Sequence, residues 1–309
     1  MSGVVRIGTR GSPLAVAQAK WVASRIEAAR PGMKAELICI KTSGDRFTDR
    51  PLRELGGKGL FVKEIEEALL AGHIDCAVHS LKDLPASLPD RLLIAAVPTR
   101  VTSADVLVTR EGWRLEQLPR GVRIGTSSLR RTALLQWLRP DLECVPLRGN
   151  LDTRLRKLEA GELHAVVVAE AGLLRLGVNL GKTCALDPVI FLPAVGQGAL
   201  AVETRADHWA AVLRFLHDET TGHEIAAERA FLAALGGSCH TPIAARAYAV
   251  GGVLTLHGLV ADPAGRQVIR GRRSGSIDLA KRIGESVAEQ VLDNGGARFL
   301  HLESAASGA

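Results

Sequence analysis

Polar side chains capable of chemistry follow a short apolar segment near residue 80. Residues 74–78 (IDCAV) are typical of a buried strand, and the chain then places Ser80, Lys82 and Asp83 ahead of Pro85. Ligands of open parallel α/β sheets bind beyond the carboxyl ends of the strands. Asp83 is therefore a candidate for a reactive carboxylate, although the Lys82-Asp83 pair taken alone also fits a solvated turn.

Hydroxyl and guanidinium groups follow the predicted strands of the middle of the chain. Together with the N–H groups of helix starts, they are natural partners of carboxylates and phosphates. The segments concerned are GTSSLRR (125–131), LRGN (147–150) and AEAGLLR (169–175), with Asn150 as the expected N-cap of a helix that carries Arg154. A single arginine here fits an exposed surface residue, but five at equivalent strand exits favour anion binding.

Cys239 differs from the other four cysteines because it lies in a glycine-rich loop, GGSCHTP (236–242). An accessible thiol of this kind is incidental, a nucleophile or a covalent attachment point. The odd cysteine count and the lack of a C-x-x-C pair indicate neither a disulfide framework nor a zinc site. Cys39, Cys76 and Cys144 lie in apolar, strand-like runs, where we expect core residues.

The composition of the 309 residues is that of a globular protein with two or three domains, 47% hydrophobic and 23% charged. No apolar run approaches the roughly 20 residues of a membrane span, and the first residues lack the apolar region of a signal peptide. We therefore expect a cytoplasmic protein. Its net charge of +6 would suit nucleic acid, but only 4% of residues are aromatic, so few bases could stack and no nucleic-acid partner is expected.

The sequence predicts two similar α/β lobes, which would position these residues. Residues 4–7 and 34–40 are predicted strands on either side of a helix that Ser12 caps and Pro13 opens. RIGT at 6–9 recurs at 123–126, and AGHIDCAV at 71–78 is echoed by AGELHAVV at 160–167. A loop is expected over residues 42–59, a helix marked by Phe61, Ile65 and Leu69 that ends near Gly72, and a strand over 92–97.

A third region follows a predicted crossing at residues 193–198, which leads back to the first lobe. Two-lobed binding folds have such crossings, with the ligand in the cleft between the lobes. Helices are predicted over residues 207–218 and, after the TTG at 220–222, up to Leu235. Strands over 243–250, 253–261 and 267–273 would form an antiparallel meander, closed by a helix over 278–292.

Seven ordered motifs resemble the hydroxymethylbilane synthase family, also called the porphobilinogen deaminases, over essentially the whole chain. They are GTRGSPLA (8–15), GGKGLF (56–61), HSLKDLP (79–85), GTSSLRR (125–131), LRGN (147–150), LPAVGQG (192–198) and GGSC (236–239). The resemblance implies an α/β fold of two similar periplasmic-binding-protein-like lobes around a cleft, plus a small C-terminal α+β domain with a three-stranded antiparallel sheet. Residues 1–98 and 199–217 would form lobe one, 104–192 lobe two and 218–309 the C-terminal domain.

The resemblance also implies an activity. Such proteins are monomeric transferases of tetrapyrrole (porphyrin, heme) biosynthesis that condense four porphobilinogen molecules head to tail with loss of ammonia and release linear hydroxymethylbilane by hydrolysis. They carry a dipyrromethane cofactor on a cysteine thioether, at a position that matches Cys239 here, and no metal. Asp83 would be the catalytic residue, and residues 47–58 a lid.

Carboxylates of cofactor, substrate and growing chain would be held by a set of mainly cationic and hydroxyl-bearing residues. The resemblance implies Arg10, Ser12, Gln18, Lys58, Ser80, Lys82, Thr126, Ser127, Ser128, Arg130, Arg131, Arg148, Gly149, Arg154, Arg175 and Gln197. Among the arginines, we predict that 130, 131 and 154 hold cofactor or chain, whereas 10, 148 and 175 lie nearer the incoming substrate.

A protein of another class would share much of this architecture. A two-lobed small-anion binding or sensor protein without catalysis would have the same lobes and hinge. It would need neither Asp83 nor Cys239, so the intact mass of the purified protein distinguishes the two hypotheses.

Overall fold

The structure, a computed structural model, describes residues 3–46, 61–179, 181–236 and 241–300. The chain divides into two compact units. The first comprises Met1–Val101, Leu174–Gly177 and Gly198–Gly222, and the second comprises Thr102–Leu173, Val178–Gln197 and His223–Ala309. The predicted lid, with Lys58, and the Cys239 loop lie outside the described residues.

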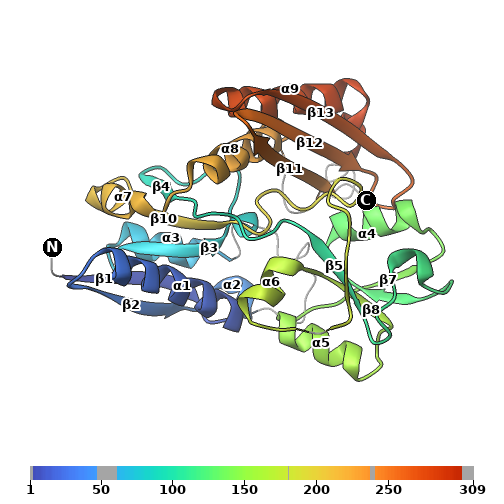
Figure 1. The fold of residues 1–309 in the computed structure, drawn as a ribbon, viewed down its shortest axis with the longest axis horizontal. Coiled ribbons are helices and arrows are strands. Elements are labelled where there is room, and N and C mark those ends of the chain that lie inside the picture. Colours follow the sequence, from blue (N-terminus) through green and yellow to red (C-terminus); the bar gives the residue numbers. More distant parts are fainter. Residues whose placement is uncertain (1–2, 47–60, 180, 237–240, 301–309) are drawn as a thin grey trace, which may run out of the picture. The chain divides into compact units, whose positions relative to one another are not determined.

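A five-stranded sheet in the order β2-β1-β3-β10-β4 forms the first unit (Figure 1). Strands β1, β2 and β3 are parallel, and β10 is antiparallel to both β3 and β4. Cys76 and Val78 of β3 pack with helix α1, whereas Ala77 packs with helix α3, so helices cover both faces of this central strand. The elements are β1 (Gly3–Arg10), α1 (Pro13–Ala29), β2 (Met33–Ile40), α2 (Ser43–Arg46), α3 (Lys63–Leu70), β3 (Cys76–Ser80), β4 (Leu92–Ala96), β10 (Leu200–Arg205) and α7 (His208–Leu213).

The second unit contains a sheet of the same design, in the order β7-β6-β8-β5-β9. Strands β6, β7 and β8 are parallel, and β5 is antiparallel to β8 and β9. Residues of β8 alternate between a cluster with α4 and a cluster with α5. The elements are β5 (Asp105–Thr109), β6 (Arg123–Gly125), α4 (Leu129–Leu138), β7 (Glu143–Val145), α5 (Leu151–Glu159), β8 (Ala165–Ala169), α6 (Glu170–Arg175) and β9 (Thr183–Ala185). The last two residues of α6, Leu174 and Arg175, belong to the first unit.

The repeat predicted from the sequence is confirmed at the level of strand register. Ile7 pairs with Cys76 where β1 meets β3, and Ile124 pairs with Ala165 where β6 meets β8. These four positions are the ones that the two sequence echoes place in correspondence. The two lobes therefore bring equivalent strand ends to equivalent sheet edges.

The second unit also contains a three-stranded antiparallel sheet of β11 (Ile243–Val250), β12 (Val253–Ala261) and β13 (Val268–Ser276). Helices α8 (Glu219–Ala234) and α9 (Ala280–Asp293) cover it. A Cβ at Gly284 would lie 2.3 Å from the Ala227 carbonyl oxygen, so glycine permits these two helices to approach closely. Leu259 of β12 shares a core cluster with Leu134 of α4, which joins this sheet to the second lobe.

Two local predictions are wrong. Helix α8 begins at Glu219 rather than after Gly222, because Asp218 accepts a hydrogen bond from the Thr221 N–H at 2.7 Å and stabilises the first turn. The predicted loop over 42–59 begins with the short helix α2. The Ser43 N–H donates to Glu64 Oε1 of α3 at 2.8 Å, a contact between segments that local sequence does not reveal.

Candidate active site

The carboxyl edge of the first sheet gathers several predicted site residues. The parallel neighbours β1 and β3 end at Arg10 and Ser80, so the segments after them leave the same edge. Ser12 caps α1 by accepting from the Ala15 N–H at 3.3 Å, as predicted. Gln18 of α1 is buried and its Nε2 donates to Ser80 Oγ at 2.9 Å, so the helix and the strand end are tied together here.

Asp83 lies in a single 3-10 turn, Leu81–Asp83, directly after β3. The buried Leu81 fixes this turn, since its N–H donates to the Ala199 carbonyl at 3.1 Å. Asp83 itself is half-buried, and across the described ranges no hydrogen bond or ion pair joins its carboxylate to another residue. The structure thus holds an uncompensated anion on a rigid support, which suits stabilisation of a positive charge in a substrate.

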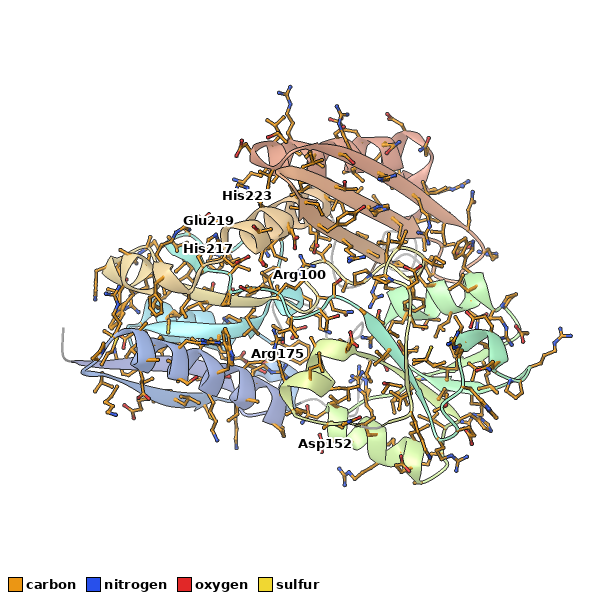
Figure 2. All side chains as sticks on the ribbon, viewed as in Figure 1. Arg100, Asp152, Arg175, His217, Glu219 and His223 are labelled. Atoms are coloured by element: carbon orange, nitrogen blue, oxygen red, sulfur yellow. The ribbon has the colours of Figure 1, made fainter. Side chains whose placement is uncertain are left out.

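Arg175 approaches the same sheet edge from the end of α6 (Figure 2). Its Nη2 donates to the Gly198 carbonyl at 2.8 Å, one residue before the Ala199 that holds the Asp83 turn. Burial lowers the pKa of Arg175 to about 10, so it remains a cation at neutral pH. Arg10 lies nearby along β1, with its guanidinium carbon 4.3 Å from the centre of the Phe61 ring.

In the second lobe, the predicted hydroxyl residues shape the loops around the arginines. Ser127 Oγ donates to the Leu147 carbonyl at 2.8 Å, which ties the loop after β6 to the loop after β7. Ser128 caps α4 by accepting from the Arg131 N–H at 3.4 Å. Thr126 is buried, and its Oγ1 accepts from the Ser128 N–H at 3.2 Å. These contacts fix the start of the helix that carries Arg130 and Arg131.

Arg154 is positioned by the loop after β7. Its Nε donates to the Gly149 carbonyl at 2.9 Å. Gly149 has a φ of 104°, and a Cβ there would lie 2.8 Å from Thr153 Cγ2, so a side chain would distort the LRGN loop that also carries Arg148. Burial, and then the charge of Arg131, lowers the pKa of Arg154 to about 10. Asn150 occupies the N-cap of α5 as predicted, but its side chain makes no capping bond.

Asp105 is the residue of this region that the sequence reasoning missed. It begins β5 with no exposed surface, and its two carboxylate oxygens lie 2.7 Å from Nη1 of Arg130 and 2.7 Å from Nη2 of Arg131. Burial alone would raise the pKa of Asp105, but the charges and hydrogen bonds of both arginines hold it below its ordinary value. The available signal was an acidic residue heading an otherwise apolar buried strand, DVLVT.

The side chain of Gln197, which is predicted to bind ligand, is hydrogen-bonded to this buried carboxylate. Its Nε2 donates to Asp105 Oδ1 at 3.0 Å and to the Ser103 carbonyl at 2.8 Å. The residue is fully buried. A positioning role therefore accounts for these contacts of the Gln197 side chain.

The residues of the second lobe fit a ligand with several carboxylates. Arg130 is 5% exposed, and its Nε has no acceptor among the described residues. A buried donor without a partner is costly, and a ligand carboxylate would supply the missing acceptor. Arg130 and Arg131 share the carboxylate of Asp105, and Arg154 is close enough to Arg131 for the charge of Arg131 to lower its pKa.

A second buried cluster lies behind β3 in the first unit. His79 Nε2 of β3 lies 3.0 Å from Glu203 Oε2 of β10, and both side chains are buried. Glu66 of α3 faces this pair. Burial, and then the charge of Glu203, raises the pKa of Glu66 to about 7, while His79 opposes the shift. The cluster therefore binds a proton in the folded protein at a pH where an exposed glutamate would be ionised.

We predict that Glu66→Gln stabilises the protein selectively at alkaline pH. Because the folded-state pKa of Glu66 lies above its ordinary value of 4.5, wild-type stability falls as the pH rises from about 4.5 to about 7. The shift corresponds to about 3 kcal/mol. Urea denaturation of the full-length protein at pH 5 and pH 8 measures the free energy of unfolding. The wild type should lose stability between these two pH values, and the variant should not.

Glu67→Gln is the matched control, since Glu67 is the exposed neighbour on the same helix and forms only a 4.0 Å ion pair with Lys63. It should retain the wild-type pH dependence. An unchanged loss of stability between pH 5 and pH 8 in Glu66→Gln would show that Glu66 is not the group that takes up the proton.

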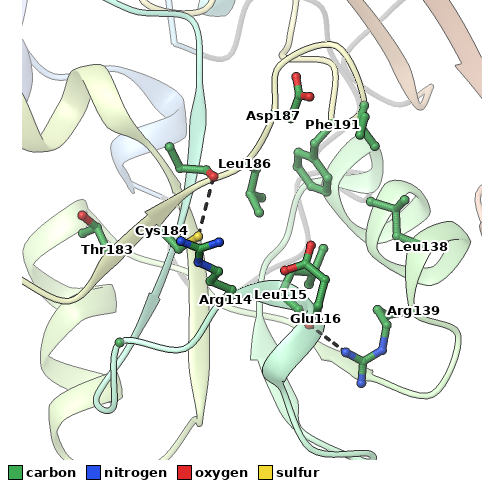
Figure 3. A pocket seen from close by; sticks show the side chains of 13 residues that line it. Arg114, Leu115, Glu116, Leu138, Arg139, Thr183, Cys184, Leu186, Asp187 and Phe191 are labelled. Atoms are coloured by element: carbon green, nitrogen blue, oxygen red, sulfur yellow. Dashed lines mark hydrogen bonds between the residues drawn. The ribbon is translucent and has the colours of Figure 1, made fainter.

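A pocket of about 720 Å³ lies elsewhere in the second lobe, between β9 and the turn Leu115–Gln117 (Figure 3). Leu138, Arg139, Cys184 and Phe191 are among its lining residues, and no predicted site residue belongs to the lining. Arg139 is occupied by Asp141 at 2.8 Å and by the Leu115 carbonyl at 2.7 Å. The pocket is therefore separate from the residues that are predicted to bind carboxylates.

The chain contains two α/β lobes of equivalent topology, each with arginine and hydroxyl side chains at its strand exits, and a smaller three-stranded antiparallel sheet. Residues 5–212 match the family described as "Porphobilinogen deaminase, dipyromethane cofactor binding domain", and residues 223–293 match "Porphobilinogen deaminase, C-terminal domain". The chain belongs to the porphobilinogen deaminase family. It is accordingly an enzyme of tetrapyrrole biosynthesis with dipyrromethane as its cofactor.

Curated relatives match over nearly their whole length. The porphobilinogen deaminase of Syntrophobacter fumaroxidans is 49% identical over 96% of this chain and 97% of its own, and that of Syntrophus aciditrophicus is 51% identical over 97% and 99%. Among solved structures, YhfZ from Shigella flexneri is 19% identical with a TM-score of 0.35, covering 77% of this chain and 98% of its own. Within the described ranges, no helix is long and apolar enough to cross a membrane.

Proposed function

We propose that this enzyme joins four porphobilinogen molecules head to tail, releases one ammonia at each step and frees linear hydroxymethylbilane by hydrolysis. The observation that carries the proposal is the Asp83 carboxylate, which lacks a partner among described residues and stands on a fixed turn at the sheet edge that Arg175 also reaches. Family membership supplies the substrate class.

Asp83 acts on the charge that develops in porphobilinogen. The bond between the aminomethyl carbon and nitrogen breaks, the electron pair leaves with ammonia, and a delocalised pyrrole cation remains. The carboxylate is in place before the reaction and stabilises that cation as it forms. The methylene carbon of the cation then forms a carbon–carbon bond with the α carbon of the last pyrrole ring of the growing chain, and that ring loses its α proton. Dipyrromethane, when bound, supplies the first such ring.

The cations and hydroxyl groups bind and orient the carboxylates. Arg130, Arg131 and Arg154 are assigned to the cofactor and growing chain, and Arg10, Arg148 and Arg175 to the incoming substrate, with Ser12, Ser80 and Lys82 beside Asp83. Each pyrrole unit brings two carboxylates, so only a group of cations can hold the lengthening chain. Planar guanidinium forks bind carboxylates at two points, which orients as well as attracts them. Cys239 is assigned as the thioether attachment point and Lys58 as a further binding residue.

The proposal extends to the setting of the enzyme. We assign residues 1–98 and 199–217, 104–192 and 218–309 to its three domains, and expect a cytoplasmic monomer without a nucleic-acid partner. The low aromatic content, 4%, supports the last point. Sedimentation at micromolar concentration should give the mass of one chain.

Turnover of porphobilinogen tests the proposed function. The purified protein should consume four porphobilinogen molecules and release four of ammonia for each hydroxymethylbilane formed, with denatured protein as the control. Binding of porphobilinogen without release of ammonia would contradict the proposal and support the small-anion binding alternative.

A further inference from the structure

Asp105 holds two arginines of the proposed anion site by different contacts. Arg131 donates to Oδ1 through both Nε, at 3.1 Å, and Nη2, at 2.7 Å, while its Nη1 donates to the Val167 carbonyl at 3.0 Å. Each of its three nitrogens therefore donates one hydrogen bond within the protein, and Nη1 and Nη2 each carry a second N–H. Arg130 donates through Nη1 to Oδ2 at 2.7 Å and to the Leu192 carbonyl at 2.8 Å, which leaves its Nε without an acceptor.

The same carboxylate is connected to the C-terminal sheet through buried polar groups. Gln197 donates to Asp105 at 3.0 Å, and the preceding residue, Gly196, donates its N–H to Glu228 Oε2 of α8 at 2.7 Å. Glu228 Oε1 accepts from the Ala247 N–H of β11 at 2.9 Å. Because Glu228 and Asp105 have no exposed surface, these contacts are shielded from water and hold their geometry.

The net charge of Asp105 and its two arginines also depends on the Asp105 carboxylate. Two guanidinium groups share one carboxylate, so Arg130, Arg131 and Asp105 together carry a net charge of +1. Loss of the carboxylate charge would leave two buried cations facing each other at +2. Their mutual repulsion would turn the side chains away from the orientation that the hydrogen bonds impose.

We propose that Asp105 is a positioning residue for chain elongation, which fixes the orientation of Arg130 and Arg131 and sets the net charge with which the pair binds carboxylates of the growing chain. This inference rests on the proposed function. Gln197 supports Asp105 from the crossing segment, and Glu228 holds that segment in turn. Elongation requires each new pair of carboxylates to be bound in a defined place, so a misaligned pair stalls the chain at an early length.

The test compares the lengths of protein-bound chains. Asp105→Asn keeps the shape of the side chain and removes its charge. Protein purified with its cofactor is mixed with limiting porphobilinogen, quenched and measured by intact mass. We expect the ratio of short to fully extended adducts to rise roughly tenfold or more, the effect of losing a hydrogen bond to a charged group. A purely structural defect would lower the fraction of active protein without changing this ratio.

Asp141→Asn is the matched control. It breaks another arginine–aspartate pair of the same unit, in which Asp141 lies 2.8 Å from Arg139, and should leave the ratio unchanged. If Asp105→Asn does not fold, Gln197→Met tests the positioning role of Asp105. This substitution removes the hydrogen bonds to Asp105 and Ser103 without altering the charge. It should raise the same ratio by a smaller factor.

The outcomes separate the inference from the proposed function. Wild-type chain lengths in folded Asp105→Asn, or in Gln197→Met where the first variant does not fold, overturn the positioning role alone. Wild-type protein that forms no adducts with porphobilinogen overturns the proposed function, and the positioning role with it.

Discussion

Replacement of Asp83 by Asn is expected to slow condensation about a thousandfold while the fold is retained. Attraction between unit charges about 4 Å apart is on the order of 4 kcal/mol at an effective dielectric constant near 20. This upper-end figure corresponds to roughly three orders of magnitude in rate. Asn is nearly isosteric with Asp, and the turn it occupies is fixed by the backbone of Leu81, so the change removes charge rather than shape.

The carboxylate could in principle also donate a proton to the departing amine. An ionised carboxylate cannot be a general acid, so we assign its effect to electrostatic stabilisation. Asp83→Glu, which keeps the charge and displaces it, should retain a small part of the activity.

Asp90→Asn serves as the control, since Asp90 is an exposed residue of the same segment. Single-turnover rates of cofactor-loaded protein give the comparison without interference from product release. Near-normal turnover in cofactor-loaded Asp83→Asn would transfer the catalytic role to another residue.

Cys239→Ser should fold but lack the covalent cofactor, and its turnover should fall to background. A serine hydroxyl ionises far less readily than a thiol, so it does not replace the thiolate as a nucleophile. Cys39→Ser is the control because Cys39 is an exposed thiol among the described residues. It should keep both cofactor and turnover. A cofactor bound covalently in Cys239→Ser would mean that another residue is the anchor.

Local periodicity and internal repetition were sufficient to predict much of the fold. The meander was predicted at residues 243–250 and 253–261, and β11 and β12 have these bounds. Gly251 and Gly252 adopt positive φ angles between them, which glycine allows without strain. The repeat predicted the equivalence of β1 with β6, because each pairs with its echo in the same register.

Features that depend on tertiary contacts could not be predicted from the sequence. Cys39 was expected in the core because its run is apolar, but it is exposed, since β2 is an edge strand of its sheet. Cys76 of the central strand is buried as predicted. Asp105 was missed because its arginine partners are 25 and 26 residues away in sequence. The placement of Asp83 at a strand exit was predictable, whereas its support by Ala199 of the returning segment was not.

The most direct test of the account is the intact mass of the purified wild-type protein, followed by peptide mapping. We expect an excess of mass equal to two linked pyrrole units, located on the peptide that contains Cys239. Addition of porphobilinogen should then yield a ladder of heavier species, each larger by one further unit. Fully active protein with an unmodified Cys239 would contradict the assignment of a covalent dipyrromethane at this residue.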